Sequence, residues 1–402
     1  MSVLNGVRVL DLTRVLAGPL TGQILADMGC DVVKIERPGT GDDTRGWVPP
    51  FARDSDGGST DVSAYFLSAN RGKRSVTVDL DHPDGCALVQ RLATHADVLV
   101  ENYRVGDLAR RGLDHASLSA LNPRLVYCSI TGYGQTGPYA ERPGYDPIAQ
   151  AFGGLMSITG VPAGEPVRCG VSIVDILTGI YGAVAVAGAL FGRASTGLGQ
   201  HVDLALLDVQ VASLVNVAQA YLSSGVTPAR MGSAHPSVVP SQVFPASDGY
   251  LMLTAGNDGQ FDRLCDVLDR RDLAQDERFA TNRQRVRHRD ALIAILSEVL
   301  VTRSRAAWVE ACTAVGVPCA PINSVAEAFD DPQVRHREMT FGMPDPALGM
   351  VTLLASPLRF SATPVEYRRP PPRLGEHTAE VLHDWLGLDA AAVATLRGAG
   401  AL

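Results

Sequence analysis

Residues 7–36 read VRVLDLTRVLAGPLTGQILADMGCDVVKIE, and this stretch decides the fold. The apolar runs at 7–12 and 31–36 predict two strands, and residues 20–28 between them predict a helix that ends at Gly29. Alternating strands and helices are typical of a mostly parallel sheet covered by helices on both faces, so the sequence predicts an α/β fold. The alternation continues with predicted strands at 75–79, 97–101 and 125–130 and a helix that begins near Pro83.

Polar residues follow the predicted strands, and in such folds ligands bind at the carboxyl ends of the strands. Arginine at or near three of these ends favours an anionic, phosphate-bearing ligand. The turn after the first strand lacks G-x-G-x-x-G, so Glu36 alone gives a nicotinamide or flavin enzyme little support. The four ends are Thr13-Arg14, Glu36-Arg37, residues 101–104 (ENYR) and residues 131–133 (TGY).

Asp175 is the only charged residue between residues 171 and 191. Burying a carboxylate without partners costs several kcal/mol, so this one needs compensation. Ser172-x-x-Asp175 before an apolar run resembles a capping box, which predicts a helix that begins here with Asp175 in its first turn. Backbone N–H groups and the helix dipole favour negative charge there, so Asp175 is either an ordinary capping residue or a nucleophile.

The composition predicts a large protein core in two domains, since the 402 residues are 46% hydrophobic and 19% charged. A net charge of −8 argues against nucleic acid or an anionic membrane as partner. Seven scattered cysteines without C-x-x-C indicate reduced thiols in the cytoplasm and no metal site. The start lacks a basic signal-peptide region, and the apolar run at 176–191 is shorter than the roughly 20 residues of a membrane helix. Lys34 and Lys73 are the only lysines, which we attribute to genomic base composition.

The second half begins with a Gly-, Ser-, Ala- and Pro-rich linker at 225–240. Residues 242–246 and 250–254 flank Ser-Asp-Gly and predict a hairpin. Helices are expected around 260–268, 290–300 and 305–315, which together with the hairpin make a smaller α+β domain. We interpret the arginine-rich residues 283–289 as a solvated helix face.

Short segments between residues 6 and 378 form an ordered set that covers nearly the whole chain. In this order they resemble the class III (CaiB/BaiF) CoA-transferases, which include formyl-CoA, carnitine-CoA and succinyl-CoA:dicarboxylate CoA-transferases. The segments are 6–13 (GVRVLDLT), 17–19 (AGP), 33–37 (VKIER), 44–47 (TRGW), 70–75 (NRGKRS), 100–102 (VEN), 144–146 (GYD), 170–179 (GVSIVDILTG), 248–249 (DG), 318–321 (PCAP) and 374–378 (LGEHT).

The resemblance implies that Asp175 is the catalytic aspartate. In the family this carboxylate attacks a donor acyl-CoA, and CoA is then carried as an aspartyl-CoA thioester until a small carboxylic acid accepts it. Local backbone N–H groups are expected to stabilise the oxyanions. Trp47 matches an active-site aromatic residue. By the same resemblance the CoA-contacting residues are Leu16, Ala17, Arg37, Val78, Asn102, Tyr103, Arg110, Tyr145 and Asp146, with Arg104 as an addition.

Two departures from related enzymes narrow the reaction. The histidine of the 2-methylacyl-CoA racemases falls at Tyr145, and a phenol with a pKa near 10 is a poor base at neutral pH. The glycine-rich loop of formyl- and oxalyl-CoA enzymes is replaced by residues 231–236 (MGSAHP), which disfavours formate and oxalate. A racemase and a non-catalytic acyl-CoA-binding protein remain as alternatives. His235 is either near the acyl site or in a structural turn. The expected acceptor is a dicarboxylate such as succinate, mesaconate or citramalate, or a carnitine-like, bile or aromatic acid, and Arg14 and Arg168 are candidate clamps for its carboxylate.

The resemblance also implies the architecture. A large Rossmann-like domain would comprise residues 1–222, a small α+β domain residues 223–330, and residues 331–402 would return to the large domain. Two chains would thread through each other as an interlocked homodimer. The Gly- and Ala-rich helix after Asp175 fits close packing between the chains.

Overall fold

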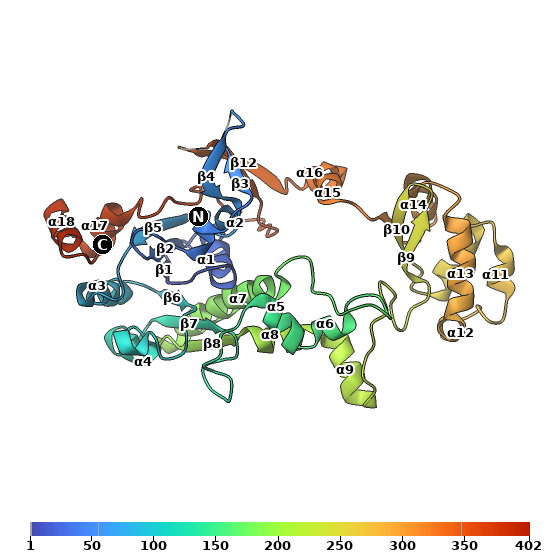
Figure 1. Ribbon diagram of the computed structural model, residues 1–402, viewed down its shortest axis with the longest axis horizontal. Helices are drawn as coiled ribbons and strands as arrows, with labels where there is room; N and C mark the ends of the chain where they lie inside the picture. The colour runs from blue at the N-terminus through green and yellow to red at the C-terminus, as the bar shows by residue number, and fades with distance from the viewer. Residues whose placement is uncertain (1, 55, 347) are drawn as a thin grey trace. The chain divides into compact units, whose positions relative to one another are not determined.

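The computed structural model describes residues 2–54, 56–346 and 348–402. The chain divides into two compact units, each built from segments distant in sequence (Figure 1). The large unit comprises Met1–Leu155, Cys169–Gln219 and His336–Leu402, and the small unit comprises Met156–Arg168 and Ala220–Arg335. These boundaries lie close to the expected ones at 222/223 and 330/331. The excursion of residues 156–168 into the small unit was not predicted.

The large unit contains a six-stranded parallel sheet in the order β5-β2-β1-β6-β7-β8. The predicted strands and the helix after Pro83 are confirmed, and Gly29 follows α1 with a positive φ of 102°. Strand β8 was missed because it is a short edge strand with exposed alternate residues. The strands are β1 Arg8–Asp11, β2 Asp31–Glu36, β3 Phe51–Arg53, β4 Ser59–Ser63, β5 Lys73–Thr77, β6 Val98–Glu101, β7 Val126–Thr131, β8 His201–Ala205, β9 Ser241–Ala246, β10 Gly249–Thr254, β11 Cys319–Pro321, β12 Thr340–Asp345 and β13 Gly349–Leu354.

Helices cover both faces of this sheet. The two-residue period of a strand sends Val9 to one face and Leu10 to the other, and both are fully buried. Val9 packs with residues of α1 and α7, while Leu10 packs with residues of α3 and α17. The helices are α1 Ala17–Asp27, η1 Asp43–Gly46, α2 Ala64–Ser68, α3 Pro83–Thr94, η2 Ala109–Arg111, α4 His115–Leu121, α5 Asp146–Phe152, α6 Leu155–Ile158, α7 Ile173–Thr196, α8 Leu206–Ser213, α9 Val215–Ser224, α10 Asp258–Val267, α11 Arg271–Gln275, α12 Asn282–Arg287, α13 Arg289–Leu300, α14 Arg305–Ala314, α15 Val325–Asp330, α16 Pro332–His336, α17 Thr378–Leu386 and α18 Ala390–Gly398.

The C-terminal segment returns to the large unit through Arg74 on β5. The Arg74 guanidinium pairs with Asp31 on β2 and with Glu380 and Asp384 on α17, at 2.5–3.0 Å. Trp385 Nε1 donates to the same Asp31 at 3.0 Å. The segment is therefore bound to the edge of the sheet that β5 forms, as the resemblance implies.

Helix α7 crosses close to α1, and this contact requires glycine. A Cβ atom at Gly182 would lie 2.5 Å from Thr21 Oγ1, and one at Gly179 would lie 2.9 Å from the Ala17 carbonyl oxygen. Thr21 Oγ1 also donates to the Gly179 carbonyl oxygen at 3.0 Å. The glycines of this helix thus place its second and third turns directly beside the first turns of α1.

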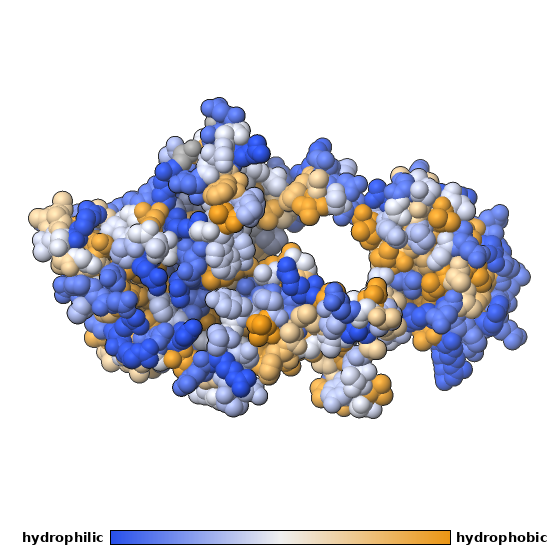
Figure 2. All heavy atoms as spheres, viewed as in Figure 1, coloured by the Kyte–Doolittle hydropathy of each residue, from blue (hydrophilic) through white to orange (hydrophobic). Residues whose placement is uncertain are grey.

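The other side of α7 is apolar and exposed. The expectation that this apolar segment is too short for a membrane helix is wrong, because α7 has 24 residues and is long and apolar enough to cross a membrane. One side of α7 packs on α1, α8 and β7. Hydrophobic side chains lie at the surface around α5, α7 and α8 (Figure 2). They include Phe152, Ile180, Tyr181, Val184, Phe191 and Val211. The homodimer expected here stays a prediction, which sedimentation analysis would test.

The small unit is built around the antiparallel sheet β11-β10-β9, with helices α10 to α14. The predicted hairpin is confirmed, since β9 and β10 pair through residues 241–254. The prediction that residues 283–289 form a solvated face is wrong at Arg285, which is fully buried. Its guanidinium donates to the carbonyl oxygens of Val239 and Phe279 and pairs with Asp258. Three acceptors make burial of this charge possible.

Candidate functional site

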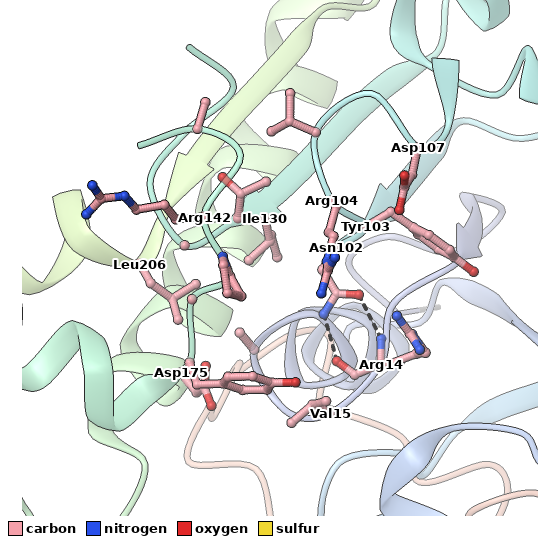
Figure 3. A pocket seen from close by; sticks show the side chains of 18 of the residues that line it. Arg14, Val15, Asn102, Tyr103, Arg104, Asp107, Ile130, Arg142, Asp175 and Leu206 are labelled. Carbon is pink, nitrogen blue, oxygen red and sulfur yellow. Dashed lines mark hydrogen bonds between the residues drawn. The ribbon is translucent and has the colours of Figure 1, made fainter. Parts of the chain in front are cut away.

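A cavity of about 270 Å³ opens in the large unit at the carboxyl ends of β1, β6 and β7 (Figure 3). This is the edge of the sheet where a ligand was expected. Asp175 and Arg14 both line it, from α7 and from the loop after β1. The rest of the wall comes from residues 15–17, 102–105, 130–132 and 140–145, together with Asp43, Asp107 and Leu206.

Asp175 lies in the first turn of α7, as predicted, and its side chain is nearly buried at 9% exposure. Burial and, to a smaller extent, the negative charge of Asp146 together raise the pKa of this carboxyl to about 7. Asp175 therefore changes its charge near neutral pH. A carboxylate that is desolvated and faces a cavity is a reactive group in a functional position.

The predicted capping box at the start of α7 is wrong. Ser172 is the N-cap residue, but its side chain makes no capping hydrogen bond. Asp146 takes this part instead, because its Oδ1 accepts from Val174 N at 2.8 Å and Asp175 N at 3.3 Å. Ile173 N donates to the Val171 carbonyl oxygen. These N–H groups of the first turn of α7 are occupied, and the expectation that local backbone N–H groups stabilise an oxyanion stays a prediction.

Asp146 is itself held from α5, of which it is the first residue. Gln150 Nε2 donates to Asp146 Oδ2 at 2.7 Å, and the carboxylate is 2% exposed. The preceding residue, Tyr145, is 57% exposed and lines the cavity. Neighbouring residues thus have different surroundings, and Asp146 faces the helix rather than the cavity.

Two glycines hold the 140–145 loop against the end of β7. A Cβ atom at Gly132 would lie 2.7 Å from Gly144 Cα, and one at Gly144 would lie 2.4 Å from Gly132 Cα. Only residues without a side chain allow this approach. The contact fixes the place of Tyr145 at the cavity wall.

The opposite wall depends on a two-way amide contact. Arg14 N donates to Asn102 Oδ1 at 3.0 Å, and Asn102 Nδ2 donates to the Arg14 carbonyl oxygen at 2.7 Å (Figure 3). The Arg14 guanidinium pairs with Asp43 and lies 5.4 Å from the centre of the Tyr103 ring. Val15 has a φ of 74°, a strained conformation for a β-branched residue. Strain of this kind is common in loops that contact ligands.

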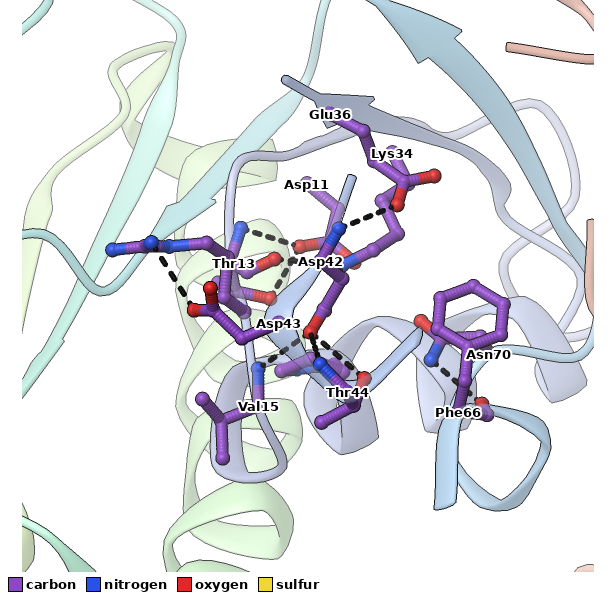
Figure 4. Close-up of polar contacts among 12 residues, drawn as sticks. Asp11, Thr13, Val15, Lys34, Glu36, Asp42, Asp43, Thr44, Phe66 and Asn70 are labelled. Carbon is purple, nitrogen blue, oxygen red and sulfur yellow. Dashed lines mark hydrogen bonds and ion pairs between the residues drawn. The ribbon is translucent and has the colours of Figure 1, made fainter. Parts of the chain in front are cut away.

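Both lysines of the chain lie beneath this wall, and both are fully buried. Lys73 Nζ donates to Asp11 Oδ2, the Pro19 carbonyl oxygen and Asn70 Oδ1 at 2.8–3.0 Å. Lys34 Nζ donates to the Thr13 carbonyl oxygen at 2.7 Å and pairs with Asp42 at 2.9 Å (Figure 4). These bonds connect β1, β2 and β5 to the loop that carries Arg14, Val15 and Leu16.

The pKa values in this lysine cluster follow from burial and attraction. Burial lowers the pKa of Lys73 to about 8, against the attraction of Asp11. Burial would raise the pKa of Asp11, but Lys73 and Lys34 hold it below its ordinary value. Asp42 accepts from Thr44 N and Val15 N through its Oδ1, so the second ion pair also orders the start of η1 (Figure 4).

The cavity gathers Asp175 and most of the predicted CoA contacts: Leu16, Ala17, Asn102, Tyr103, Arg104 and Tyr145. Four predicted residues do not line it. Asp146 caps α7, Val78 is 1% exposed within the core, and Arg37 is exposed after β2. Arg110 lines a neighbouring surface cavity of about 730 Å³, and Asp107 lines both cavities. The binding roles of all these residues stay predictions.

Tyr65 was missed by the sequence reasoning, since no motif contains it. Burial raises the pKa of its hydroxyl while Ser172, the N-cap residue of α7, lowers it, so the hydroxyl lies near the start of α7. Its ring centre lies 5.1 Å from that of Trp47. Trp47 is 42% exposed and reaches the nucleophile region through Tyr65. Of the other candidates, His235 belongs to a turn in which its Nδ1 accepts from Ser237 N. Arg168 is part of the small unit.

Known proteins resemble this chain along nearly its whole length. The family model described as CoA-transferase family III matches residues 4–378. A succinate–glutarate CoA-transferase of Agrobacterium fabrum is 50% identical over 379 residues, 94% of either chain. The human succinyl-CoA:glutarate CoA-transferase is 42% identical and covers 99% of this chain and 89% of its own. A crystal structure of a CaiB/BaiF family protein from Brucella suis has a TM-score of 0.85 and 47% identity, covering 96% of this chain and 100% of that one.

The Lys73→Met variant is expected to lose about 3–5 kcal/mol of the free energy of unfolding, because it leaves Asp11 buried without its partner. Denaturant unfolding of the variant and wild type measures this loss. Adding Asp11→Asn should recover part of it. Arg91→Ala, at an exposed position on α3, is the control and should unfold like wild type. Equal stability of Lys73→Met and wild type would contradict the assignment.

Asp175→Asn is expected to stabilise the protein at pH 8. The pKa of Asp175 is about 7 in the folded protein and about 3.9 unfolded, so between these values the folded state binds the extra proton and stability falls as pH rises. The variant should therefore gain up to about 4 kcal/mol over wild type at pH 8, and much less at pH 4.5. Denaturant unfolding at both pH values measures the difference in free energy of unfolding between the variant and wild type. An equal difference at pH 8 and pH 4.5 would contradict the raised pKa of Asp175.

Asp146→Ala is expected to cost about 1–2 kcal/mol, the loss of a helix cap. Ser172→Ala should cost less than half as much, because that side chain makes no capping bond. The two variants, compared by denaturant unfolding at pH 5, separate the observed cap from the capping box read from the sequence. A larger loss for Ser172→Ala would reverse the assignment.

Proposed function

This chain belongs to CoA-transferase family III, and from that premise we propose that it transfers CoA through a covalent thioester on Asp175. The observation that carries the proposal is the nearly buried carboxylate of Asp175 on the wall of the cavity. Covalent catalysis needs a nucleophile that is exposed to the substrate and shielded from water. Asp175 meets both needs. Being a CoA-transferase, the chain acts on CoA thioesters and carboxylic acids.

The reaction is balanced without water or a net proton. A carboxylate oxygen of Asp175 attacks the thioester carbon of the donor, and the C–S bond breaks to give an anhydride and CoA thiolate. The thiolate attacks the aspartyl carbonyl carbon and releases the donor acid. The acceptor carboxylate attacks the aspartyl thioester in the same way, and the thiolate then takes the acceptor acyl group and returns Asp175 as a carboxylate.

The ionised form of Asp175 is the nucleophile. Since its pKa is about 7, the reactive fraction rises with pH through neutrality. A carboxylate that is poorly solvated is also a stronger nucleophile than one in water. The cavity lining contains no histidine among the described residues, which favours acyl transfer over proton abstraction by a racemase.

The two cavities that share Asp107 fit an elongated ligand. The smaller cavity holds Asp175, and the larger one is lined by Arg110 and Arg111. We assign the thioester end of CoA to the first and the phosphate-bearing end to the second. Arginine recognises phosphate oxygens through its planar set of donors.

The proposed donor is succinyl-CoA and the proposed acceptor is glutarate, as the names of the relatives indicate. A dicarboxylate reacts through one carboxylate, so the second needs a cation near the nucleophile. Arg14 is suited to this, because its Nε is buried without a hydrogen-bond partner among the described residues and the side chain lines the cavity. An unpartnered guanidinium donor favours an anionic ligand.

Succinyl-CoA should form an adduct on Asp175 that hydroxylamine converts to a hydroxamate, detected by peptide mass spectrometry. Glutarate should then yield glutaryl-CoA. Asp175→Asn should abolish the hydroxamate and slow turnover at least about 1,000-fold. Asp208→Asn is the matched control, since Asp208 lies exposed in the first turn of α8. Turnover of Asp175→Asn at the wild-type rate would rule out the mechanism.

A further inference from the structure

Glu101 is a further buried carboxylate, and it lies behind the loop that forms one wall of the cavity. Glu101 is the last residue of β6 and is 5% exposed. Its Oε2 accepts from Tyr103 N at 2.8 Å, and so the side chain closes the turn that presents Asn102, Tyr103 and Arg104 to the cavity. Asn102 in turn holds the backbone of Arg14. The carboxylate therefore controls the geometry of the loop without touching the cavity itself.

Polar side chains connect Glu101 to the surface. Ser129 on β7 is the residue that pairs with Glu101 across the sheet, and its hydroxyl lowers the pKa of the Glu101 carboxyl. Ser129 Oγ lies 2.9 Å from His201 Nε2 on β8. His201 is exposed, and its ring stacks on that of His115 with centres 4.9 Å apart. All these side chains line a cavity of about 280 Å³ on the other side of the loop. Three adjacent strands thus contribute one group each to a continuous path.

We propose that Glu101 is a positioning residue for the CoA-binding loop 102–104, and that it exchanges its proton with solvent through Ser129 and His201. The inference rests on the proposed function, because it assigns CoA to this loop. The ionised carboxylate accepts both the Tyr103 N–H and the Ser129 hydroxyl. Hydrogen bonds to an ionised acceptor are roughly twice as strong as neutral ones, so this state holds the loop best.

The proton count along the path is balanced. When Glu101 loses its proton to Ser129 Oγ, the Ser129 proton passes to His201 Nε2, and His201 releases the proton on Nδ1 to water. Afterwards Ser129 donates to Glu101 and His201 donates to Ser129. One proton has left the protein, and His201 has changed from one neutral tautomer to the other.

The surroundings place this exchange in the neutral range. Burial raises the pKa of Glu101, Ser129 and Tyr103 N lower it, the negative charge of Asp203 raises it, and the net result is a pKa of about 7. Burial lowers the pKa of His201, and His115 lowers it further, so the ring is neutral and can act as the exit. The titratable and charged groups around the path are Tyr103, Arg104, Asp114, His115, Tyr127, Cys128, His201 and Asp203.

The test is the ratio of CoA dissociation constants for Glu101→Gln and wild type, measured by calorimetry at pH 6 and pH 8. Glutamine keeps an acceptor for Tyr103 N and a donor for Ser129, and so imitates the protonated glutamate at every pH. The CoA dissociation constant of Glu101→Gln should be about five times that of wild type at pH 8, which corresponds to the loss of about one hydrogen bond. At pH 6 the two constants should be about equal, because Glu101 is then protonated in wild type. The ionisations of CoA and of Asp175 are common to both proteins and cancel in the ratio.

His115→Gln is the control, because its ring stacks on His201 but is not part of the hydrogen-bonded path; its ratio should be about one at both pH values. The same ratio at both pH values for Glu101→Gln would overturn the inference, whether that ratio is one or five. If Glu101→Gln fails to fold, Ser129→Ala is measured instead. Because this variant removes a donor to the carboxylate, the pH at which the CoA dissociation constant changes should rise. An unchanged pH midpoint for Ser129→Ala overturns the inference. Absence of CoA binding by wild type would refute the proposed function itself.

Discussion

Two carboxylates compete for the N-terminus of α7, and this competition shapes the site. Asp146 obtains the N–H groups of Val174 and Asp175, while Asp175 is left in the same helical turn without them. A carboxylate that accepts such bonds is stabilised, whereas one that is only buried is destabilised. The structure therefore gives Asp146 the stable position and Asp175 the reactive one. The helix begins where it does because a residue of another helix caps it.

The two loops that form the cavity wall are fixed by contacts of two kinds. On one side the Gly132–Gly144 contact fixes the loop of Tyr145, and on the other the buried lysines fix the loop of Arg14. Buried ion pairs of this kind add little net stability compared with apolar packing, but they allow few alternative arrangements. The ion pairs therefore act mainly by fixing the position of the Arg14 loop, since both loops must face the first turn of α7.

The sequence predicted the elements whose signals are local. Strands β1, β2, β5, β6 and β7 follow from continuous apolar runs, whereas the short polar strands β3 and β4 were not predicted. The start of α7 follows from the change to a long apolar segment after Ser172. The set of Leu16, Ala17, Asn102, Tyr103, Arg104 and Tyr145 came from the family resemblance, and the structure places all six around one cavity with Asp175.

What could not be predicted depends on distant residues. The cap on α7 comes from 28 residues upstream, and the partner of Lys73 is 62 residues away. No spacing rule relates such pairs, because the sheet order decides which ones meet. Arg285 was misread for the same reason: its acceptors at Val239, Asp258 and Phe279 are brought together only by folding.

The burial of both lysines has a chemical consequence for an enzyme that handles activated acyl groups. Thioesters such as succinyl-CoA acylate amines that are exposed and unprotonated. Lys34 and Lys73 are the only lysines of the chain, and each Nζ is enclosed by oxygen acceptors with no exposed surface. The permanent positive side-chain charges on the surface are carried by arginine, whose guanidinium stays protonated and is a poor nucleophile. The folded protein therefore offers its own substrate no lysine side chain to modify.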